Sequence, residues 1–549
     1  MESLVCHRPS SFPSGSELLQ WGPVADKYLM DESRRRGSAA ALALPKTRAE
    51  VCAVLREASE RGLPVTVSGA RTGIAAGAVP QEGIVLSLER MNRIRGLRTD
   101  EDGTVLVRCE AGVPLSDLQR QLGTRSFADS ATWDEASLQC LRELLEAPPL
   151  FHPPDPTETG ASIGGTVACD ASGAHSFRYG PTRPHVRRIV LALADGSELD
   201  LSREQCHADE QGHFLLQRTD GTAREAKVPL YARPATKNVV GYHSGTGMDL
   251  IDLFIGSEGT LGVLTEVELA LSPLPEKQCG VTLFCPSEDA AIRLTQLLRD
   301  ERSDLGIEAI EYLDADALDM LRRHREAIGA GSGVPDCLPT NAQCALHLDL
   351  GLSDDGLPVG LERIAAVARA QGAAPERCWT ALDARERERL RVFRHAVPEC
   401  VNARIAEIQK HHPEIAKLGT DMAVPDRHLP EIMSTYREGL ARTGLTSAVF
   451  GHIGDNHLHV NIVPNDPSEY ERGKQLYREF ARRVVELEGS VAAEHGVGKL
   501  KTEFAAMMLG EQGLREMRAV KALFDPAGIL GPGTLLRTSH GLTPEAQNS

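Results

Sequence analysis

Histidine side chains gather in one short segment, GHIGDNHLHV, which contains His452, His457 and His459. The residues on either side read as two strands, and a two-residue turn at 455–456 would place His452 opposite His459. The period of two adds His457 and Asn461 to the same strand face. Imidazoles fixed in this way can hydrogen-bond to the main chain or bind a divalent metal, and a catalytic metal site needs a third protein donor.

A second segment, SVAAEHGVGKLK, supplies Glu494 and His495. A carboxylate beside a histidine offers one more metal donor and one candidate proton acceptor. Two histidines, one carboxylate and an open position could activate water for hydrolysis or could assist a redox reaction. The choice between these chemistries depends on whether the chain also binds a redox cofactor.

Three glycine-rich segments favour a cofactor. They are VTVSGARTGIAAGAVP at 65–80, ASIGGTVACDASGAHSFRYGPTR at 161–183 and FIGSEGTLGVLTEV at 254–267. The first of them neither follows the G-x-G-x-x-G pattern nor ends as a P-loop does. Backbone amides exposed by glycine can hold a pyrophosphate, although glycine loops also occur as plain turns. Three such loops together indicate a long, flat dinucleotide that the backbone approaches at several points.

In this order, the glycine segments resemble the FAD-binding domain of the vanillyl-alcohol-oxidase-type flavoproteins. The resemblance implies that the first loop and the IGG segment wrap the FAD pyrophosphate. The family usually has glycine at the positions of Ala70 and Arg71. The cofactor-binding residues that the resemblance implies are Ser68, Gly69, Ala70, Arg71, Thr72, Gly73, Ser162, Gly164, Gly165, Thr166 and Gly262.

GHIGDNHLH and AAEHG together resemble the C-terminal domain of the FAD-linked D-2-hydroxyacid dehydrogenases. This family includes D-lactate dehydrogenase, D-2-hydroxyglutarate dehydrogenase and the flavin subunit of glycolate oxidase. Its pattern is close to G-H-x-G-D-G-N-x-H, and this chain has Asn456 and His457 in place of the usual Gly and Asn. The resemblance implies a catalytic base at His495 and a divalent metal, zinc favoured and manganese possible. The implied metal ligands are His452, His459 and Glu494, and the role of His457 stays open.

The same resemblance places Arg394, Lys417 and Asn461 at positions that contact substrate, where the two cations would hold a carboxylate. Each could instead be a solvated surface group. Pro398 stands where the 2-hydroxyglutarate enzymes tend to have a hydroxyl residue. One anchor for a second carboxylate is therefore missing, which favours D-lactate or another monocarboxylate over D-2-hydroxyglutarate. A D-2-hydroxyglutarate dehydrogenase and a glycolate oxidase flavin subunit remain the alternatives within the family. A metal-dependent hydrolase and a non-catalytic FAD subunit are competing interpretations of the same residues.

Helices and strands interleave along the chain, which predicts an α+β fold of several domains. We expect an N-terminal extension at 1–40, an FAD-binding domain at 41–277 and a substrate and metal domain at 278–536. The last segment of the second domain would return to the first, and 537–549 would form a polar tail. Residues 120–160 look irregular. Two charged helices are expected, at 376–396 and 398–412.

The formal charge is −17, from 77 acidic and 60 basic residues, which argues against a nucleic-acid partner. No apolar run reaches the length of a membrane span, and no export signal precedes the first domain. We expect a cytoplasmic protein that could lie peripheral to the inner membrane and could form a homodimer. The 12 cysteines form no C-x-x-C pair, so the sequence shows no iron–sulfur cluster motif. The resemblance implies that electrons leave the flavin for an external acceptor, such as a cytochrome, a quinone or an electron-transfer flavoprotein.

Overall fold

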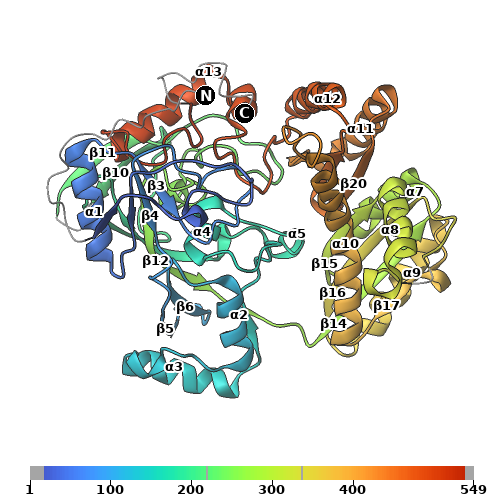
Figure 1. Ribbon diagram of the computed structural model, residues 1–549. Helices are drawn as coiled ribbons and strands as arrows, with labels where there is room; N and C mark the ends of the chain where they lie inside the picture. Colours follow the sequence, from blue (N-terminus) through green and yellow to red (C-terminus); the bar gives the residue numbers. More distant parts are fainter. Residues whose placement is uncertain (1–17, 218–220, 336–337, 538–549) are drawn as a thin grey trace.

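The computed structural model describes residues 18–217, 221–335 and 338–537 of the chain (Figure 1). Residues 1–17 of the expected N-terminal extension and residues 538–549 of the expected polar tail lie outside the described ranges. The described residues combine helices with several β-sheets. The predicted α+β class is therefore confirmed. None of the helices in the described ranges combines the length and apolar character needed to cross a bilayer.

A small sheet opens the first half of the molecule. Its strand order is β1-β2-β4-β3, and β2, β4 and β3 run parallel. Helix α1 packs its apolar side inward; Thr47 caps its first turn and Gly62 ends it with a positive φ of 61°. The bounds are β1 Leu19–Trp21, β2 Ala41–Ala43, α1 Arg48–Arg61, β3 Val65–Ser68 and β4 Ile84–Ser87.

An antiparallel five-stranded sheet, in the order β5-β6-β12-β8-β9, completes this half. A hairpin turn at 195–196 joins β8 to β9, with Gly196 at a φ of 76°. Residues 120–160 are more regular than expected, because they contain a whole helix, α3. The bounds are β5 Ile94–Thr99, β6 Val105–Glu110, α2 Leu115–Thr124, α3 Glu135–Glu146, β7 Leu150–Phe151, α4 Ile163–Cys169, α5 Ser176–Tyr179, β8 Val186–Ala192, β9 Glu198–Ser202, β10 His213–Gln217, β11 Ala223–Lys227, α6 Ile251–Phe254, β12 Val263–Ala270 and β13 Ser272–Pro273.

An eight-stranded antiparallel sheet forms the second half, in the order β17-β14-β16-β15-β20-β21-β18, with β19 also paired to β21. Figure 1 shows α8, α9 and α10 beside β14–β17, and α11 and α12 near β20. The bounds are β14 Lys277–Cys285, α7 Glu288–Asp300, β15 Ile307–Leu313, α8 Ala315–Ile328, β16 Cys344–Leu352, α9 Gly356–Ala370, β17 Trp379–Ala381, α10 Ala384–Gln409, β18 Leu418–Gly419, β19 Met422–Ala423, α11 Leu429–Thr443, β20 Ser447–His452, β21 His457–Ile462, α12 Pro467–Glu486 and α13 Thr502–Phe524.

Helix α10 corrects one expectation. The sequence predicts helices at 376–396 and 398–412, but residues Trp379–Ala381 form strand β17, and a single helix, Ala384–Gln409, continues through Pro398. Proline lacks the amide that an interior helical position uses and normally kinks or ends a helix there. Phe393, Val397 and Val401 are buried on one side of α10, so packing on both sides of the proline favours the continuous helix.

The end of the chain returns to the first sheet. The amide of Val65 donates to the carbonyl of Ile529 at 2.7 Å, and the amide of Gly531 donates to the carbonyl of Val65 at 2.9 Å. Lys499 Nζ donates to the carbonyls of Ala76 and Gly77 at 3.2 and 2.9 Å. Residues close to the end of the chain therefore fix both β3 and the glycine loop that follows it. Figure 1 shows α13 lying over this half.

Candidate active site

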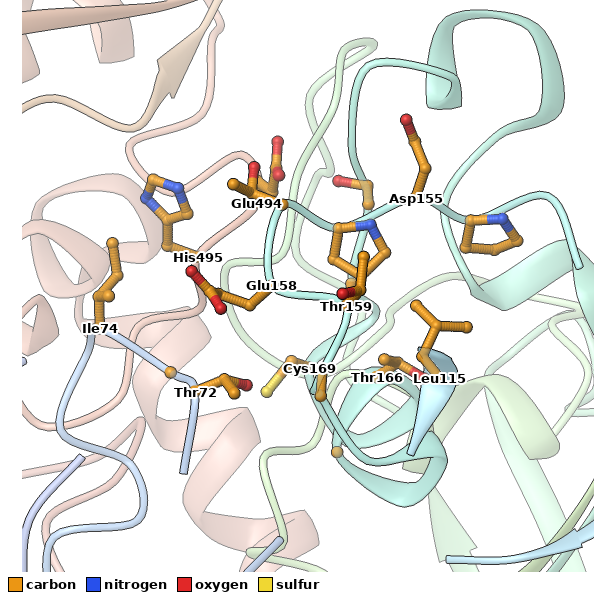
Figure 2. Close-up of a pocket in the computed structure, with 18 of the residues that line it drawn as sticks. Thr72, Ile74, Leu115, Asp155, Glu158, Thr159, Thr166, Cys169, Glu494 and His495 are labelled. Atoms are coloured by element: carbon orange, nitrogen blue, oxygen red, sulfur yellow. The ribbon is translucent and has the colours of Figure 1, made fainter. Parts of the chain in front are cut away.

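A cavity of about 1030 Å³ lies where the two halves meet. Its walls come from the three glycine-rich segments on one side and from β15, β16, α10, β20, β21 and residues 494–495 on the other. Figure 2 shows His495 and Glu494 projecting toward the same space as Glu158 and Thr159. The cavity is large enough for a dinucleotide together with a small substrate.

The glycine-rich segments fit a bound dinucleotide. A Cβ on Gly73 would meet nothing within 4 Å, so the backbone at this point is open to the cavity. A Cβ on Gly164 would lie 2.6 Å from the Cβ of Ala111, so only glycine allows α4 to pack this closely. Ser162 caps α4 by accepting from the amide of Gly165 at 3.3 Å. Apart from Ser68, all the predicted cofactor-binding residues line the cavity.

Arg71 stands where the resemblance leads one to expect glycine, yet it adopts the left-handed backbone conformation, with a φ of 64°. Its guanidinium Nη1 donates to Ser68 Oγ at 3.3 Å and to the carbonyl of Gly69 at 3.0 Å. The same group lies 5.0 Å from the centre of the Tyr28 ring. These contacts offset the cost of the backbone conformation and fix the loop. Ser68 thus contacts Arg71 rather than the cavity.

The histidine segment forms the strand pair β20–β21, but the register differs from the expected one. His452 lies opposite His457, and His459 lies opposite Phe450. Residues 453–456 connect the strands through a short 3-10 turn, and Asn456 adopts a φ of 53°. The predicted two-residue turn at 455–456 is therefore wrong. Because directly opposite residues share a sheet face, the three histidines still lie together.

The predicted metal ligands converge at this face. His452 Nε2 lies 3.3 Å from Glu494 Oε2, and one ring nitrogen from each of His452, His457 and His459 lies within 4.8 Å of the others. Burial opposes ionisation of Glu494, but Lys237 and His452 hold the pKa of its carboxyl well below its usual range. Burial and the neighbouring imidazoles hold the pKa of His459 well below normal. Glu494 and His459 are therefore in the forms that bind a divalent metal, a carboxylate and a neutral imidazole. Burial opposes protonation of His452, but Glu311 and Glu494 raise its pKa to about 10, so His452 must release a proton when a metal binds.

His495 lies beside this cluster and lines the cavity. Its ring stacks on that of His459, with centroids 5.2 Å apart. Asp421 positions it: the carboxylate accepts the amide hydrogens of Glu494 and His495 at 3.1 and 3.0 Å. Burial lowers the pKa of His495 to about 4, although Asp421 opposes the shift. The imidazole is therefore neutral at neutral pH and can accept a proton.

The three predicted substrate contacts also line the cavity. Arg394 Nη1 lies 3.5 Å from Glu311 Oε2 and has no hydrogen-bond partner among the described residues. Lys417 is exposed to the cavity, and partial desolvation lowers its pKa. Asn461 donates through Nδ2 to the carbonyl of His459 at 3.1 Å. Arg394 and Lys417 therefore place two cations at this wall that are suited to a carboxylate.

Three buried charged residues at the site were not predicted from the sequence. Glu311 Oε1 lies 2.5 Å from His452 Nδ1, Lys237 Nζ donates to Glu494 Oε2 at 3.0 Å, and Asp421 holds the backbone of residues 494–495. Only Glu311 left a signal, because β15 carries two carboxylates, Glu308 and Glu311, among residues that are otherwise apolar or aromatic. Lys237 and Asp421 occur in segments without a distinctive pattern.

Comparison with known proteins follows the division into two halves. Residues 39–138 match the family described as "FAD binding domain", and residues 274–535 match the family described as "FAD linked oxidases, C-terminal domain". The chain is an FAD-linked oxidoreductase. FAD binding removes the basis of the hydrolase interpretation, in which the glycine segments would be turns only.

Relatives of the enzyme span most of its length. It is 27% identical over 500 residues to the glycolate oxidase subunit GlcD of Bacillus subtilis, covering 90% of this chain and 88% of that protein. It is 26% identical to a D-lactate dehydrogenase of Archaeoglobus fulgidus, covering 95% of this chain and 98% of that protein. A probable mitochondrial D-lactate dehydrogenase of Danio rerio is 28% identical, with coverage of 98% and 93%.

Solved structures of low sequence identity share the fold of the enzyme. p-Cresol methylhydroxylase superposes with a TM-score of 0.62 at 14% identity, covering 94% of this chain and 93% of that one. The 4-ethylphenol oxidase of Gulosibacter chungangensis superposes with a TM-score of 0.59 at 17% identity, covering 93% and 91%. The fold is therefore of the vanillyl-alcohol-oxidase type, as the sequence predicted.

Proposed function

We propose that this enzyme oxidises a D-2-hydroxy acid, with D-lactate favoured, to the 2-oxo acid, with assistance from a divalent metal. The observation that carries the proposal is that His495, Arg394 and Lys417 line one cavity together with the glycine-rich segments. A proton acceptor and a carboxylate-binding region therefore border the space that the cofactor would occupy. The names of the relatives, D-lactate dehydrogenase and glycolate oxidase subunit, support the same substrate class.

Substrate binding in this proposal uses the two cations. Arg394 offers a planar fork of donors to the carboxylate, and Lys417 offers a point charge. Asn461 adds an amide at the same wall. These contacts orient the C2 carbon of a short hydroxy acid toward the glycine-rich half, where FAD, when bound, supplies the hydride acceptor.

Proton transfer in this proposal uses His495. Its Nδ1 faces Asp421 at 3.6 Å, which leaves Nε2 to accept the hydroxyl proton. The metal, for which we favour zinc and keep manganese as possible, would be held by His452, His459 and Glu494. When bound, it supplies positive charge that makes the hydroxyl more acidic.

D-2-hydroxyglutarate and glycolate are the competing substrates. Pro398 lines the cavity near Arg394 and offers no hydrogen-bond donor to a second carboxylate, which favours D-lactate over D-2-hydroxyglutarate. Glycolate lacks the methyl group of lactate and would gain less from apolar contacts. We further propose an external electron acceptor (a cytochrome, quinone or electron-transfer flavoprotein), a cytoplasmic location with possible peripheral membrane contact, and a possible homodimer.

Anaerobic reduction of the flavin absorbance by D-lactate, L-lactate, D-2-hydroxyglutarate and glycolate, before and after chelation, tests the function. We expect D-lactate to bleach the flavin fastest and chelation to slow the reaction. Bleaching by another acid would change the substrate but keep the reaction. If FAD is bound and no acid bleaches it, a non-catalytic FAD subunit becomes the better interpretation. Bleaching that is insensitive to complete metal removal would contradict metal assistance.

A further inference from the structure

His457 is the third histidine of the cluster and has no role in the reaction proposed above. Its side chain is 0% exposed. Nε2 lies 3.0 Å from Asp421 Oδ1 and Nδ1 lies 3.4 Å from Glu494 Oε2, yet neither contact has hydrogen-bond geometry, and neither nitrogen has another partner among the described residues. Leaving a buried polar group unsatisfied is costly, so such a group calls for an additional partner.

The three imidazoles share one arrangement. Each has one ring nitrogen close to an acceptor: Nδ1 of His452 lies 2.5 Å from Glu311 Oε1, Nδ1 of His459 lies 3.0 Å from the carbonyl of Thr420, and Nε2 of His457 faces Asp421. The second nitrogen of each ring remains available. Outer acceptors of this kind fix the tautomer and orientation of metal-binding histidines.

The remaining nitrogens of His452 and His457 point to one place. His452 Nε2 and His457 Nδ1 lie 3.3 and 3.4 Å from the same carboxylate oxygen, Oε2 of Glu494. Asp421 is already occupied, because it accepts two backbone amides and the Lys501 ammonium, the latter at 2.6 Å. Asp421 is therefore not free to bind the cation, and it lies outside the cluster beside Nε2 of His457, while Glu494 is the carboxylate at the centre.

We propose that His457 is a third imidazole ligand, so that the cation is held by His452, His457, His459 and Glu494. The inference rests on the metal-assisted reaction proposed above and narrows the choice of metal for that reaction. Three imidazoles favour zinc or cobalt over manganese, which prefers oxygen donors. Zinc sites can expand to five ligands, so four protein donors still allow a substrate oxygen to bind.

The test compares the FAD-loaded wild-type protein with His457→Asn, which keeps a polar side chain but removes the imidazole. The matched control is His185→Asn, because His185 is also buried but bonds to the carbonyl of Tyr179 at 2.9 Å, outside the cluster. Zinc affinity is measured by competition with a chelating dye, and zinc content by elemental analysis after dialysis. We expect His457→Asn to weaken zinc binding at least about tenfold and His185→Asn to leave it unchanged.

An equal zinc affinity in His457→Asn and wild type would overturn the role of His457 while leaving the metal in place. A wild-type protein that retains no zinc, cobalt or manganese would overturn the metal-assisted reaction itself, and this inference with it. If His457→Asn fails to fold, as judged by loss of FAD, the cobalt-substituted wild type decides. Paramagnetic NMR should then show three shifted imidazole N–H signals, and two signals would contradict the proposal.

Discussion

Lys237 and Glu494 form a buried ion pair that joins the two halves of the molecule, with Nζ 3.0 Å from Oε2. The lysine lies between β11 and α6 in the first half, and the glutamate follows α12. Their side chains are only 7% and 8% exposed. Lys237 also donates to the carbonyl of Gly173 at 3.2 Å. The carboxylate that we assign to the metal is thus positioned from the FAD-binding half.

Replacing Lys237 by methionine should therefore destabilise the metal-free protein. Removing one partner of a buried pair leaves an uncompensated charge and costs about 3–5 kcal/mol. The measurement is urea unfolding of the chelated protein. Lys277→Met is the control, because its exposed pair with Asp354 should contribute less than about 1 kcal/mol. An equal decrease in the free energy of unfolding in the two variants would show that the buried pair of Lys237 contributes no more than the exposed pair of Lys277.

The variant His495→Ala should keep its FAD but lose flavin reduction by D-lactate. Loss of a general base typically lowers the rate by about 10²–10⁴-fold. Stopped-flow bleaching of the flavin gives the rate, and the ratio of flavin to protein absorbance gives the FAD content. His411→Ala, at an exposed position just after α10, should reduce at the wild-type rate. Normal bleaching by His495→Ala would remove this residue from the mechanism.

For Arg394, substitution by methionine should weaken substrate binding more than it slows the chemical step. A charge-assisted hydrogen bond contributes about 1.5–3 kcal/mol, which corresponds to a rise in KM of roughly ten- to hundredfold. Steady-state kinetics with D-lactate measures KM and kcat separately. Arg389→Met serves as the control, because Arg389 is an exposed residue of α10. An unchanged KM in Arg394→Met would show that the carboxylate binds elsewhere.

Asp314 should make stability depend on pH. This half-buried residue caps α8, accepting amide hydrogens from Ala317 at 2.7 Å and Val449 at 3.0 Å, and desolvation of its carboxyl raises its pKa to about 7. The pKa of this carboxyl in the unfolded chain is near 3.8. Between about pH 4 and 7 the folded state therefore holds a proton on Asp314 that the unfolded state has released. The stability that this group contributes therefore falls as pH rises through that window, by at most about 1.4 kcal/mol per pH unit.

The comparison of wild type with Asp314→Asn isolates this effect, because asparagine caps the helix without titrating. The stability of the wild type relative to the variant should fall from pH 4 to 7 and become constant above about pH 8. Thermal unfolding across this range provides the measurement. Asp466→Asn, at the exposed cap of α12, should show no comparable trend. A difference that is independent of pH for Asp314→Asn would contradict the raised pKa.

The sequence predicted the gathering of histidines better than it predicted their pairing. A period of two places His457 and His459 on one face whatever the turn, so the shared face could be inferred. The register could not, because it depends on Asn456 adopting a positive φ at the end of a 3-10 turn. Local residue type allows several turn lengths there, and only the complete sheet selects one.

Buried charges were the least predictable part of the site. Glu311, Lys237 and Asp421 come from three separate regions of the chain and acquire their roles through contacts with distant residues. Pro398 misled in a different way: its local preference predicts a helix end, whereas buried neighbours on both sides of it stabilise one long helix. In both cases tertiary contacts determine the structure, and a short window of sequence does not predict those contacts.

The backbone pairing of Val65 with Ile529 and Gly531 has a consequence for biosynthesis. The first glycine loop follows Val65 directly, but the strand partner that fixes it is translated more than four hundred residues later. Until residues 529–531 have been synthesised, a nascent chain therefore has a cofactor site with one wall missing. Stable loading with FAD therefore belongs after synthesis of these residues, and not during translation of the FAD-binding half.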